Sequence, residues 1–426
     1  MANAFIPYGS YWSTPFAKWQ GPLANLNSIR LAAEVGRRFL EAKRIPREKI
    51  DLGILGITNP QPGSFYGLPW LTGLLGLESV PGPTVQQACA TSARALQMAA
   101  AEVAQGSAGC ALIVCADRMS NGPVVYYPDA TAPGGRGITE SWTLDNFGHD
   151  PYAKNAMIDT AENASARLGI GAAELNEVTL ARYAQYQAAL ADDRAFQRRY
   201  MVEAPLFDSG FRRQTGTLAA DEGIFPTTAE GLAKLKPVKP NGTHTFGTQT
   251  HPADGNAGMI VTTKDKAASL SADKSVTIQI LSYFIEFNRN FTGVINKCKA
   301  VYNNKEAMDN RWLTERMDRV YHELHQSGYA HSAEVWQDED LVAGIIGIAI
   351  GKIFFVEFLF SAVKNGDVFA LESLLQALNK KEFILADMQK ASLFMEEFSF
   401  DEISRLSYLH ICKTNSEEFS REKTIF

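Results

Sequence analysis

Cys89 is the residue of this sequence best suited to nucleophilic chemistry. It lies in the segment VQQACATSARAL, where a short apolar run ends and a helical pattern begins. Backbone N–H groups and the dipole at a helix start stabilise negative charge, which favours the thiolate form of a cysteine. The small residues Ala88, Ala90 and Ser92 leave room for a thioester carbonyl, and the N–H groups of the helix start are candidate oxyanion donors. The alternative interpretation from spacing alone is an inert, small core residue.

The remaining cysteines and the histidines show no metal or disulfide pattern. The five cysteines are sparse, odd in number and without a CxxC pair, which indicates neither a disulfide framework nor a zinc site. A reducing cytoplasm is the expected compartment. His322, His325 and His331 invite a metal interpretation, but the first two fit better as helix residues. We therefore expect no metal site and no permanently bound cofactor.

The elements around Cys89 are predicted to alternate between helix and strand. Apolar spacing indicates a helix over 24–43, strands over 51–57 and 84–87, a helix over 90–105 and a strand over 110–116. This order predicts an α/β domain with a mostly parallel sheet. Residues 121–240 are richer in glycine, proline and charge, and helices are predicted over 159–168 and 172–190. We expect them to form a large loop insertion above the sheet that carries substrate binding.

The composition of the chain changes near residues 270–285. Alanine is abundant and arginine outnumbers lysine before this point, whereas lysine, phenylalanine, asparagine and glutamate rise after it. We therefore place one domain over 1–275 and a second over 284–426. No Pro/Gly/Ser linker separates them, and Ser275–Tyr283 is predicted to be an unbroken strand.

Charge and hydropathy exclude some classes of protein. The formal net charge of −6 and the pI near 5.8 argue against a surface built for nucleic acid or anionic membrane. The N-terminus lacks the pattern of a secretory signal. The apolar segment Leu341–Val363 is interrupted by Gly351-Lys352 and Glu357, so we predict two buried strands joined by a turn rather than a membrane helix.

Motifs of one enzyme family occur in order between residues 13 and 258. They are STPFAKWQGPLA, VPGPTVQQACATSARALQMAAAEVAQGSAG, CADRMSNGP, DTAENASARLGI, LAKLKPV and GTHTFGTQTHPADGNAG. In these motifs the chain resembles the N-terminal half of the thiolases, which make or cleave 3-oxoacyl-CoA through an acyl-cysteine. The resemblance implies that Cys89 is the acylated nucleophile and that a coenzyme A thioester is the substrate.

The same resemblance implies substrate-binding residues. Thr250 stands where the family commonly has serine, in a loop that resembles the segment along the CoA pantetheine. Asp254 and Gly255 keep the family's Asp-Gly pair, and Met157 matches a pocket position.

The motifs of the second thiolase half do not occur in this sequence. The family has an Asn-Glu-Ala-Phe segment, a Gly-His-Pro-x-Gly segment whose histidine activates the nucleophile, and a second cysteine that moves the α-proton. His251 and Pro252 also replace small or aliphatic residues, so the acyl-chain preference does not carry over. Because no base for the α-proton is present, turnover needs a partner subunit or a homo-oligomer.

A different family is indicated between residues 311 and 389. The segments RWLTERMDRVYHELHQSGYAHSAEVW, LVAGIIGIAIGKIFFVEFLFS and ILADMQ occur there in order. Their apolar patterns predict strands over 332–336, 341–350 and 353–360 in an antiparallel meander, and a helix over 370–379. This part resembles the leucyl/phenylalanyl-tRNA–protein transferases, which move an amino acid from aminoacyl-tRNA to a protein N-terminus. The resemblance implies an α+β acetyltransferase-like (GNAT) domain.

Three residues of this second part are implied to act in catalysis. The resemblance assigns Glu357 to the substrate α-amino group, and Asp387 with Gln389 to a relay that helps the amine attack the ester. The alternative for Glu357 is a charge at a strand edge that faces solvent. The family's usual Gly-Glu-Ser-Met-Phe is replaced here by Val-Glu-Phe-Leu-Phe, and the family's N-terminal domain is missing. In this second part of the chain acidic residues outnumber basic ones, which weakens the case for binding tRNA phosphates.

The sequence thus leaves three hypotheses, of which the first two are transferases. The leading one is a thiolase-like acyltransferase that forms an acyl-cysteine at Cys89. The second is aminoacyl transfer from Leu- or Phe-tRNA to an acceptor protein. The third is a chimeric or truncated chain in which neither activity is intact.

Overall fold

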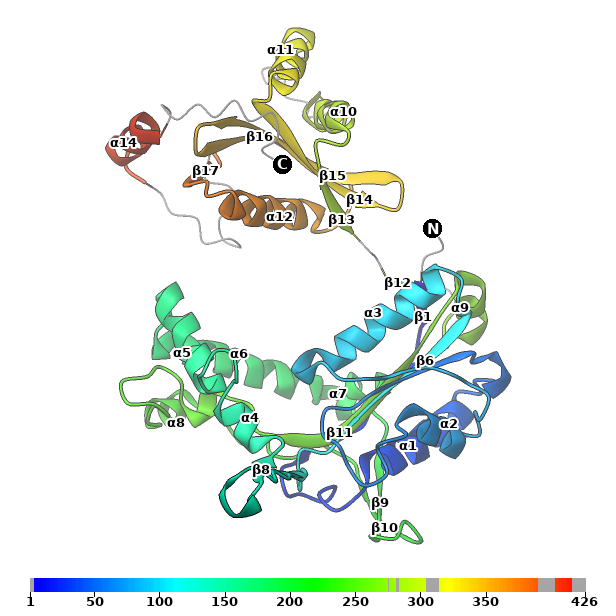
Figure 1. Cartoon of the computed structure of the whole chain (residues 1–426). Helices are drawn as coiled ribbons and strands as arrows, with labels where there is room; N and C mark the ends of the chain where they lie inside the picture. The colour runs from blue at the N-terminus through cyan, green and yellow to red at the C-terminus, as the bar shows by residue number, and fades with distance from the viewer. Residues whose placement is uncertain (1–3, 275, 281–282, 304–313, 390–402, 416–426) are drawn as a thin grey trace. The chain divides into compact units, whose positions relative to one another are not determined.

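A computed structural model describes most of the chain, and its residues fall into two compact units, Met1–Ile280 and Leu281–Phe426 (Figure 1). The described residues are 4–274, 276–280, 283–303, 314–389 and 403–415.

The described strands of the first unit's main sheet run in the order β12-β1-β11-β6-β4-β5, with β2 and β3 also paired to β11. Their bounds are β1 (Ala4–Pro7), β2 (Tyr11–Ser13), β3 (Ala17–Lys18), β4 (Leu52–Gly56), β5 (Thr84–Val85), β6 (Cys110–Asp117), β11 (Ala253–Thr262) and β12 (Thr277–Ile280).

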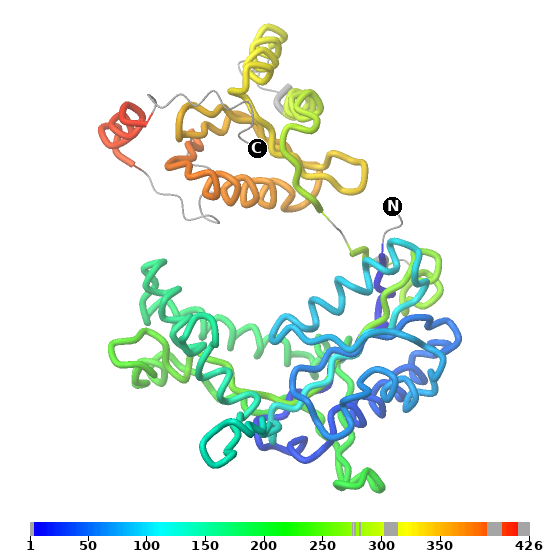
Figure 2. Tube along the Cα trace, in the orientation of Figure 1, coloured from blue at the N-terminus to red at the C-terminus, as the bar shows by residue number. Residues whose placement is uncertain are grey.

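This sheet is mixed, so the prediction of a mostly parallel sheet was wrong. β4 pairs in parallel with β5 and β6, but β11 runs antiparallel to β6, and β1 runs antiparallel to β11 and β12. The cause is the long excursion between β6 and β11, which the tube in Figure 2 follows. The chain returns to the end of the sheet that it left, with Gly255 beside Asp117, so β11 must run back along β6.

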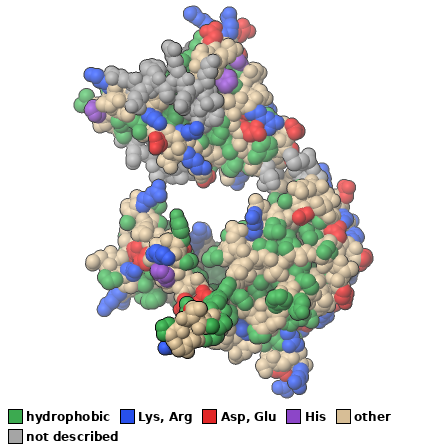
Figure 3. All heavy atoms as spheres, viewed as in Figure 1, with side chains coloured by type: hydrophobic (Ala, Val, Ile, Leu, Met, Phe, Trp, Pro, Cys, Tyr) green, Lys and Arg blue, Asp and Glu red, His purple; other side chains and the backbone are tan. Residues whose placement is uncertain are grey.

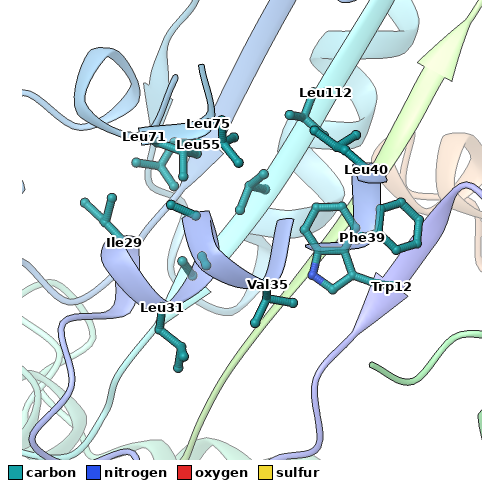
Figure 4. Packing of buried hydrophobic residues seen from close by; sticks show 14 of the residues in the cluster. Trp12, Ile29, Leu31, Val35, Phe39, Leu40, Leu55, Leu71, Leu75 and Leu112 are labelled. Carbon is teal, nitrogen blue, oxygen red and sulfur yellow. The ribbon is translucent and has the colours of Figure 1, made fainter. Parts of the chain in front are cut away.

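Helices cover both faces of the sheet. α1 (Ser28–Ala42) and α2 (Leu68–Leu75) pack with Leu55 and Leu112 on one face (Figure 4). α3 (Thr91–Ala104) packs with Ile54 and Ile113 on the other. Neighbouring strand residues thus point to opposite faces, as a sheet buried on both sides requires. The unit also contains α9 (Lys264–Leu270) and the short η1 (Arg47–Lys49) and η2 (Ala88–Ala90).

α1 shows why the predicted helices form where they do. Its buried residues include Ile29, Ala32, Val35 and Phe39, which recur at helical spacing. The side chain of Asn27 accepts hydrogen bonds from the backbone N–H groups of the first turn and so caps the helix. The predicted helix 24–43 is therefore confirmed with a later start.

The excursion between β6 and β11 contains several helices and two small hairpins joined by loops. Its described elements are β7 (Val124–Tyr127), η3 (Pro133–Gly135), β8 (Ile138–Ser141), α4 (Leu144–Gly148), α5 (Met157–Leu168), α6 (Ala172–Ala189), α7 (Ala191–Arg194), η4 (Gln197–Arg199), β9 (Ala204–Phe207), β10 (Gln214–Leu218), α8 (Ala229–Ala233) and η5 (Phe246–Thr248). The helices predicted over 159–168 and 172–190 are confirmed as α5 and α6.

The run predicted as one strand over 275–283 is divided between the units. β12 ends at Ile280 and pairs with β1, whereas β13 (Phe284–Phe287) pairs with β14 (Ala330–Gln337) in another sheet. Ser275 and residues 281–282 lie outside the described part of the chain. The predicted strand is confirmed over Thr277–Ile280, whereas Val276 and Tyr283 lie outside any strand, because a β-forming composition does not determine where pairing begins and ends.

The second unit contains a sheet in the order β13-β14-β15-β16-β17. It adds β15 (Asp340–Ile350), β16 (Ile353–Ser361) and β17 (Leu385–Asp387), with helices α10 (Phe291–Asn303), α11 (Glu315–Gln326), α12 (Gly366–Lys380) and α14 (Arg405–Asn415). β14 to β16 form the predicted antiparallel meander, β13 adds a further antiparallel strand beside β14, and β17 lies parallel to β16.

The apolar segment Leu341–Val363 forms a hairpin of two strands. Ile350 pairs with Ile353 across the turn at Gly351-Lys352, as predicted. None of the helices in the described residues has the length and apolarity that crossing a membrane requires. On the face of the molecule seen in Figure 3, basic and acidic side chains are interspersed rather than separated into large fields.

Candidate functional sites

Cys89 lies at the junction of β5 and α3, on the short helical turn η2. Its thiol is free and its side chain is exposed. Ala88, directly before it, has a φ of +44°, which is the left-handed region that residues with a Cβ seldom adopt. The cysteine therefore projects from a strained turn at the start of a helix, where a substrate can reach it.

The backbone of this turn leaves one donor available. The N–H of Ala90 donates to the carbonyl of Gln87, and the N–H of Thr91 donates to the carbonyl of Ala88. In the described part of the chain, the N–H of Cys89 has no hydrogen-bond acceptor. An N–H group at the start of a helix can stabilise the oxyanion of a tetrahedral intermediate.

No described histidine is hydrogen-bonded to the Cys89 thiol. His244 Nε2 lies 2.9 Å from Ser165 Oγ, and His251 Nδ1 lies 2.8 Å from the carbonyl oxygen of Pro252. The described residues also contain no group of three or more His, Cys, Asp or Glu side chains placed to hold a metal ion. The turn thus presents an exposed thiol and an N–H group, and no described histidine is bonded to that thiol.

The four predicted substrate-binding residues differ in accessibility. Met157 begins α5 and is 51% exposed, and Thr250 is exposed in the loop before β11. Gly255 is half-buried in β11. Asp254 is fully buried, and its Oδ1 accepts a 2.9 Å hydrogen bond from the N–H of Ser120. Asp254 therefore joins the start of β11 to the loop after β6, whereas Met157 and Thr250 remain open to a ligand.

Glu162 on α5 holds the loop that precedes β11. Its carboxylate accepts hydrogen bonds from the N–H and hydroxyl of Thr243 and from the N–H of His244. Burial alone raises the pKa of Glu162, but these hydrogen bonds hold it below its ordinary value. A shallow hollow of about 380 Å³ lies beside this contact, bordered by the ion pair of Asp159 and Lys239.

In the second unit, Glu357 occupies a β-bulge in β16. Ile346 pairs with Phe358 and Gly347 pairs with Val356, so Glu357 is the extra residue of its strand. Bulges of this kind redirect side chains near functional sites. β17 pairs with β16 only over residues 353–355, and Glu357 is half-buried, so the alternative of a strand-edge charge stays open.

Tyr321 of α11 is the partner of Glu357. Its hydroxyl donates a 3.0 Å hydrogen bond to Glu357 Oε2, and the tyrosine is buried. Burial and the neighbouring carboxylate raise the pKa of Tyr321 well above its ordinary value, so the phenol stays protonated and donates. The sequence analysis did not find Tyr321, although it lies within a segment that carries the transferase resemblance.

Asp387 ends β17 and is held at both carboxylate oxygens. Oδ1 accepts a 2.7 Å hydrogen bond from the N–H of Gln389, and Oδ2 accepts a 2.6 Å hydrogen bond from the hydroxyl of Tyr408. Gln389 is exposed and has a φ of +63°. Asp387 pairs with Phe355, two residues before Glu357 in the middle of β16, so Glu357 and the end of β17 lie on neighbouring strands. Nothing in the sequence indicated Tyr408.

The first unit has the α/β fold of a thiolase half, and the second carries the segments of an aminoacyl transferase. A family model described as thiolase, N-terminal domain, matches residues 10–265, and the chain belongs to this family. A model described as leucyl/phenylalanyl-tRNA protein transferase matches residues 262–413, so a domain of that kind follows the thiolase domain.

Solved thiolases share the fold of the first part. Human mitochondrial 3-ketoacyl-CoA thiolase superposes with a TM-score of 0.58 at 22% identity, covering 67% of this chain and 71% of the thiolase. The acetyl-CoA acetyltransferase of Bacillus anthracis superposes with a TM-score of 0.57 at 22% identity, with the same coverage of both chains. The human thiolase has also been solved in complex with CoA, at 22% identity over 67% of this chain.

Curated relatives match the second part. The leucyl/phenylalanyl-tRNA–protein transferase of Pseudomonas fluorescens Pf-5 is 36% identical over 139 residues, which are 33% of this chain and 60% of the relative. That of Flavobacterium johnsoniae is 36% identical over 130 residues, which are 30% of this chain and 60% of the relative. The chain therefore spans only a little more than half the length of these relatives.

Proposed function

We propose that the first unit accepts an acyl group from an acyl-CoA thioester onto Cys89. The observation that supports this best is the exposed thiol on a strained turn at the start of α3, beside its own unpaired N–H among the described residues. The thiolate attacks the thioester carbonyl, a bond forms between the carbonyl carbon and Sγ, and the CoA thiolate leaves with the proton that the thiol released. Met157 and Thr250 are proposed to contact the CoA substrate.

The complete thiolase reaction needs a base that the described residues do not bring to Cys89. We propose that a partner subunit or a second copy of the chain supplies it. The outer face of α3 supports this proposal, because Ala90 and Ala93 are exposed small residues next to the nucleophile and leave room for another chain. The proposed compartment is the cytoplasm, where acyl-CoA substrates and reduced thiols coexist.

Mass mapping after incubation with acetyl-CoA tests the acylation step. One acetyl mass is expected on the peptide that contains Cys89, and hydroxylamine should remove it because it is a thioester. Cys89→Ala should abolish the adduct, whereas Cys115→Ala, at a less accessible thiol of the same unit, should keep it. An unmodified Cys89 peptide at millimolar acetyl-CoA would count against the proposal.

A second candidate function is aminoacyl transfer by the second unit. It is favoured by the bulge that turns Glu357 toward Tyr321, next to the strand end that carries Asp387. An acetyltransferase-like (GNAT) fold is proposed because a parallel strand, β17, follows the antiparallel meander. In this proposal Glu357 holds the α-amino group, and Asp387, held by the N–H of Gln389, takes the proton from the attacking amine. A bond forms between the amine nitrogen and the aminoacyl carbonyl carbon, the ester bond to the tRNA breaks, and the tRNA oxygen leaves with the proton.

This second function predicts transfer of labelled leucine or phenylalanine from charged tRNA to a protein that begins with Lys or Arg. Glu357→Gln should abolish the transfer, whereas Glu372→Gln, at an exposed glutamate of α12, should not. Absence of label with the parent protein would exclude the activity. If both this assay and the acylation assay are negative, the third hypothesis, a chimeric or truncated chain with neither activity intact, is favoured.

A further inference from the structure

The turn that carries Cys89 is held by the side chain of Thr91. Thr91 Oγ accepts a 2.8 Å hydrogen bond from the N–H of Gln87 and donates a 2.7 Å hydrogen bond to the carbonyl of Ala88. The hydroxyl therefore links the two residues before the nucleophile to the first residue of α3. Both bonds cross Cys89, so they set the course of the backbone on which its thiol and N–H are carried.

The strained residue of the turn is the one that Thr91 holds. Ala88 has a φ of +44°, and an alanine returns to a negative φ unless other contacts oppose this change. The bond from Thr91 to the Ala88 carbonyl opposes it directly. A rotation at Ala88 would redirect both the Sγ atom and the N–H of Cys89, because these lie on the next residue.

Thr91 itself packs against the sheet at the end of β4. It is 5% exposed, and its methyl group faces Gly56 at the end of β4. A Cβ at Gly56 would come 2.9 Å from Thr91 Cγ2 and 2.8 Å from Cys115 Sγ, so the absence of a side chain there makes room for the threonine. The nucleophile turn is thus joined through Thr91 to the core of the first unit.

We infer that Thr91 is a positioning residue for Cys89, holding the thiol and the oxyanion donor in the orientation that acyl transfer requires. This inference rests on the proposed acylation of Cys89. A displacement of about 1 Å at a reacting centre can cost about 100-fold in rate. We therefore expect Thr91→Val, which keeps the shape and removes the hydroxyl, to lower the acylation rate about 10- to 100-fold.

The experiment compares four variants by two rates. The first rate is acetylation of Cys89 by acetyl-CoA, and the second is alkylation of Cys89 by iodoacetamide across pH. Thr91→Val should slow both acetylation and alkylation of Cys89, whereas Thr91→Ser should resemble the parent. Thr72→Val is the matched control, because Thr72 is also a buried threonine, and its hydroxyl bonds only to the backbone of its own helix.

The fourth variant separates positioning from general loss of stability. Glycine adopts a positive φ without strain, so Ala88→Gly combined with Thr91→Val should recover much of the acetylation rate lost in Thr91→Val. Equal rates in Thr91→Val and the parent, or an equal loss in Thr72→Val, would overturn the inference. If the parent is not acetylated but its alkylation profile still depends on the Thr91 hydroxyl, the proposed function fails and the positioning role stands.

Discussion

The hydroxyl of Tyr408 donates a 2.6 Å hydrogen bond to Oδ2 of Asp387, which joins α14 to the end of β17. The two residues are 21 positions apart, and the bond raises the pKa of Tyr408 well above its ordinary value. Tyr408 therefore stays protonated near neutral pH and continues to donate. Asp387 is thus held between the phenol of Tyr408 and the N–H of Gln389.

Tyr408→Phe is expected to loosen Asp387 and to destabilise the second unit. A hydrogen bond to a charged group contributes about 1.5–3 kcal/mol, and partial exposure of this pair places the expected loss at or below the lower end. If the second unit transfers amino acids, the transfer rate should also fall. Urea unfolding and the labelled-leucine assay measure the two effects.

Tyr329→Phe is the matched control for this prediction. Tyr329 is a half-buried tyrosine of the same unit, and its hydroxyl donates to no described residue. Equal stability of Tyr408→Phe and Tyr329→Phe would show that the Asp387 contact does not form in solution.

The cysteines are expected to react with iodoacetamide in a defined order. Burial raises the pKa of Cys110 and Cys115 to about 11 and that of Cys298 to about 12. Since the thiolate is the reactive form, these thiols should remain unmodified at pH 8 while exposed Cys89 is alkylated. Mass mapping over a time course checks the order, and early modification of Cys115 would contradict the packing described here.

Gly56→Ala is expected to destabilise the first unit. The added Cβ would meet Thr91 Cγ2 at 2.9 Å and Cys115 Sγ at 2.8 Å, and overpacking of this kind costs about 1–3 kcal/mol. Gly73→Ala in α2 is the control, because nothing lies within 4 Å of its Cβ and alanine favours the helix. Thermal unfolding should show a lower midpoint only for Gly56→Ala, and equal midpoints would refute the close contact.

His331 is expected to make the second unit sensitive to mild acid. Its Nε2 lies 3.2 Å from the carbonyl oxygen of Gly328 and its Nδ1 lies 3.1 Å from Asn288 Nδ2, so the neutral ring donates from Nε2 and accepts at Nδ1. Burial, with a smaller contribution from His325, lowers the pKa of His331 from 6.5 to about 4. Protonation of His331 would place an N–H donor at Nδ1, facing the N–H donor of Asn288 Nδ2, so this hydrogen bond would be lost.

The sign of this effect follows from proton binding. Between pH 6.5 and about 4 the unfolded chain binds the proton at His331 and the folded chain does not, so stability falls as the pH is lowered. The full loss is about 3 kcal/mol. Urea unfolding at pH 7 and pH 4.5 should show a smaller pH dependence for His331→Gln than for the parent. The same dependence in both proteins would exclude His331 as its source.

The type of most elements could be predicted from local pattern. The helix α3 behind Cys89, the strand β6, the helices α5 and α6, and the hairpin over Leu341–Val363 all followed from the spacing of apolar residues. Local spacing suffices for these elements because a helix and a strand each bury a face with a fixed period. The placement of Cys89 at a helix start was likewise a consequence of neighbouring residues.

The bulge at Glu357 shows what local pattern could not reveal. Phe354 and Val356 pack in the core that contains α12, whereas Phe358 and Phe360 pack in the core that contains α10 and α11. The strand therefore changes faces at Glu357, although its buried residues alternate without a break from Phe354 to Phe360. Which residue is left unpaired depends on β15 across the ladder, and a period of two along one strand does not contain that information.

The sequence by itself determined the two families and the elements near each candidate site, and it singled out Cys89 as the candidate nucleophile. Only the tertiary structure decided that β11 runs antiparallel to β6, that Thr91 holds the strained turn at Ala88, and that Tyr321 and Tyr408 bond to Glu357 and Asp387. The physical reason is the distance along the chain over which each kind of interaction acts. Apolar periodicity and helix capping act between residues close in the chain, whereas strand direction and side-chain partners depend on contacts between distant segments.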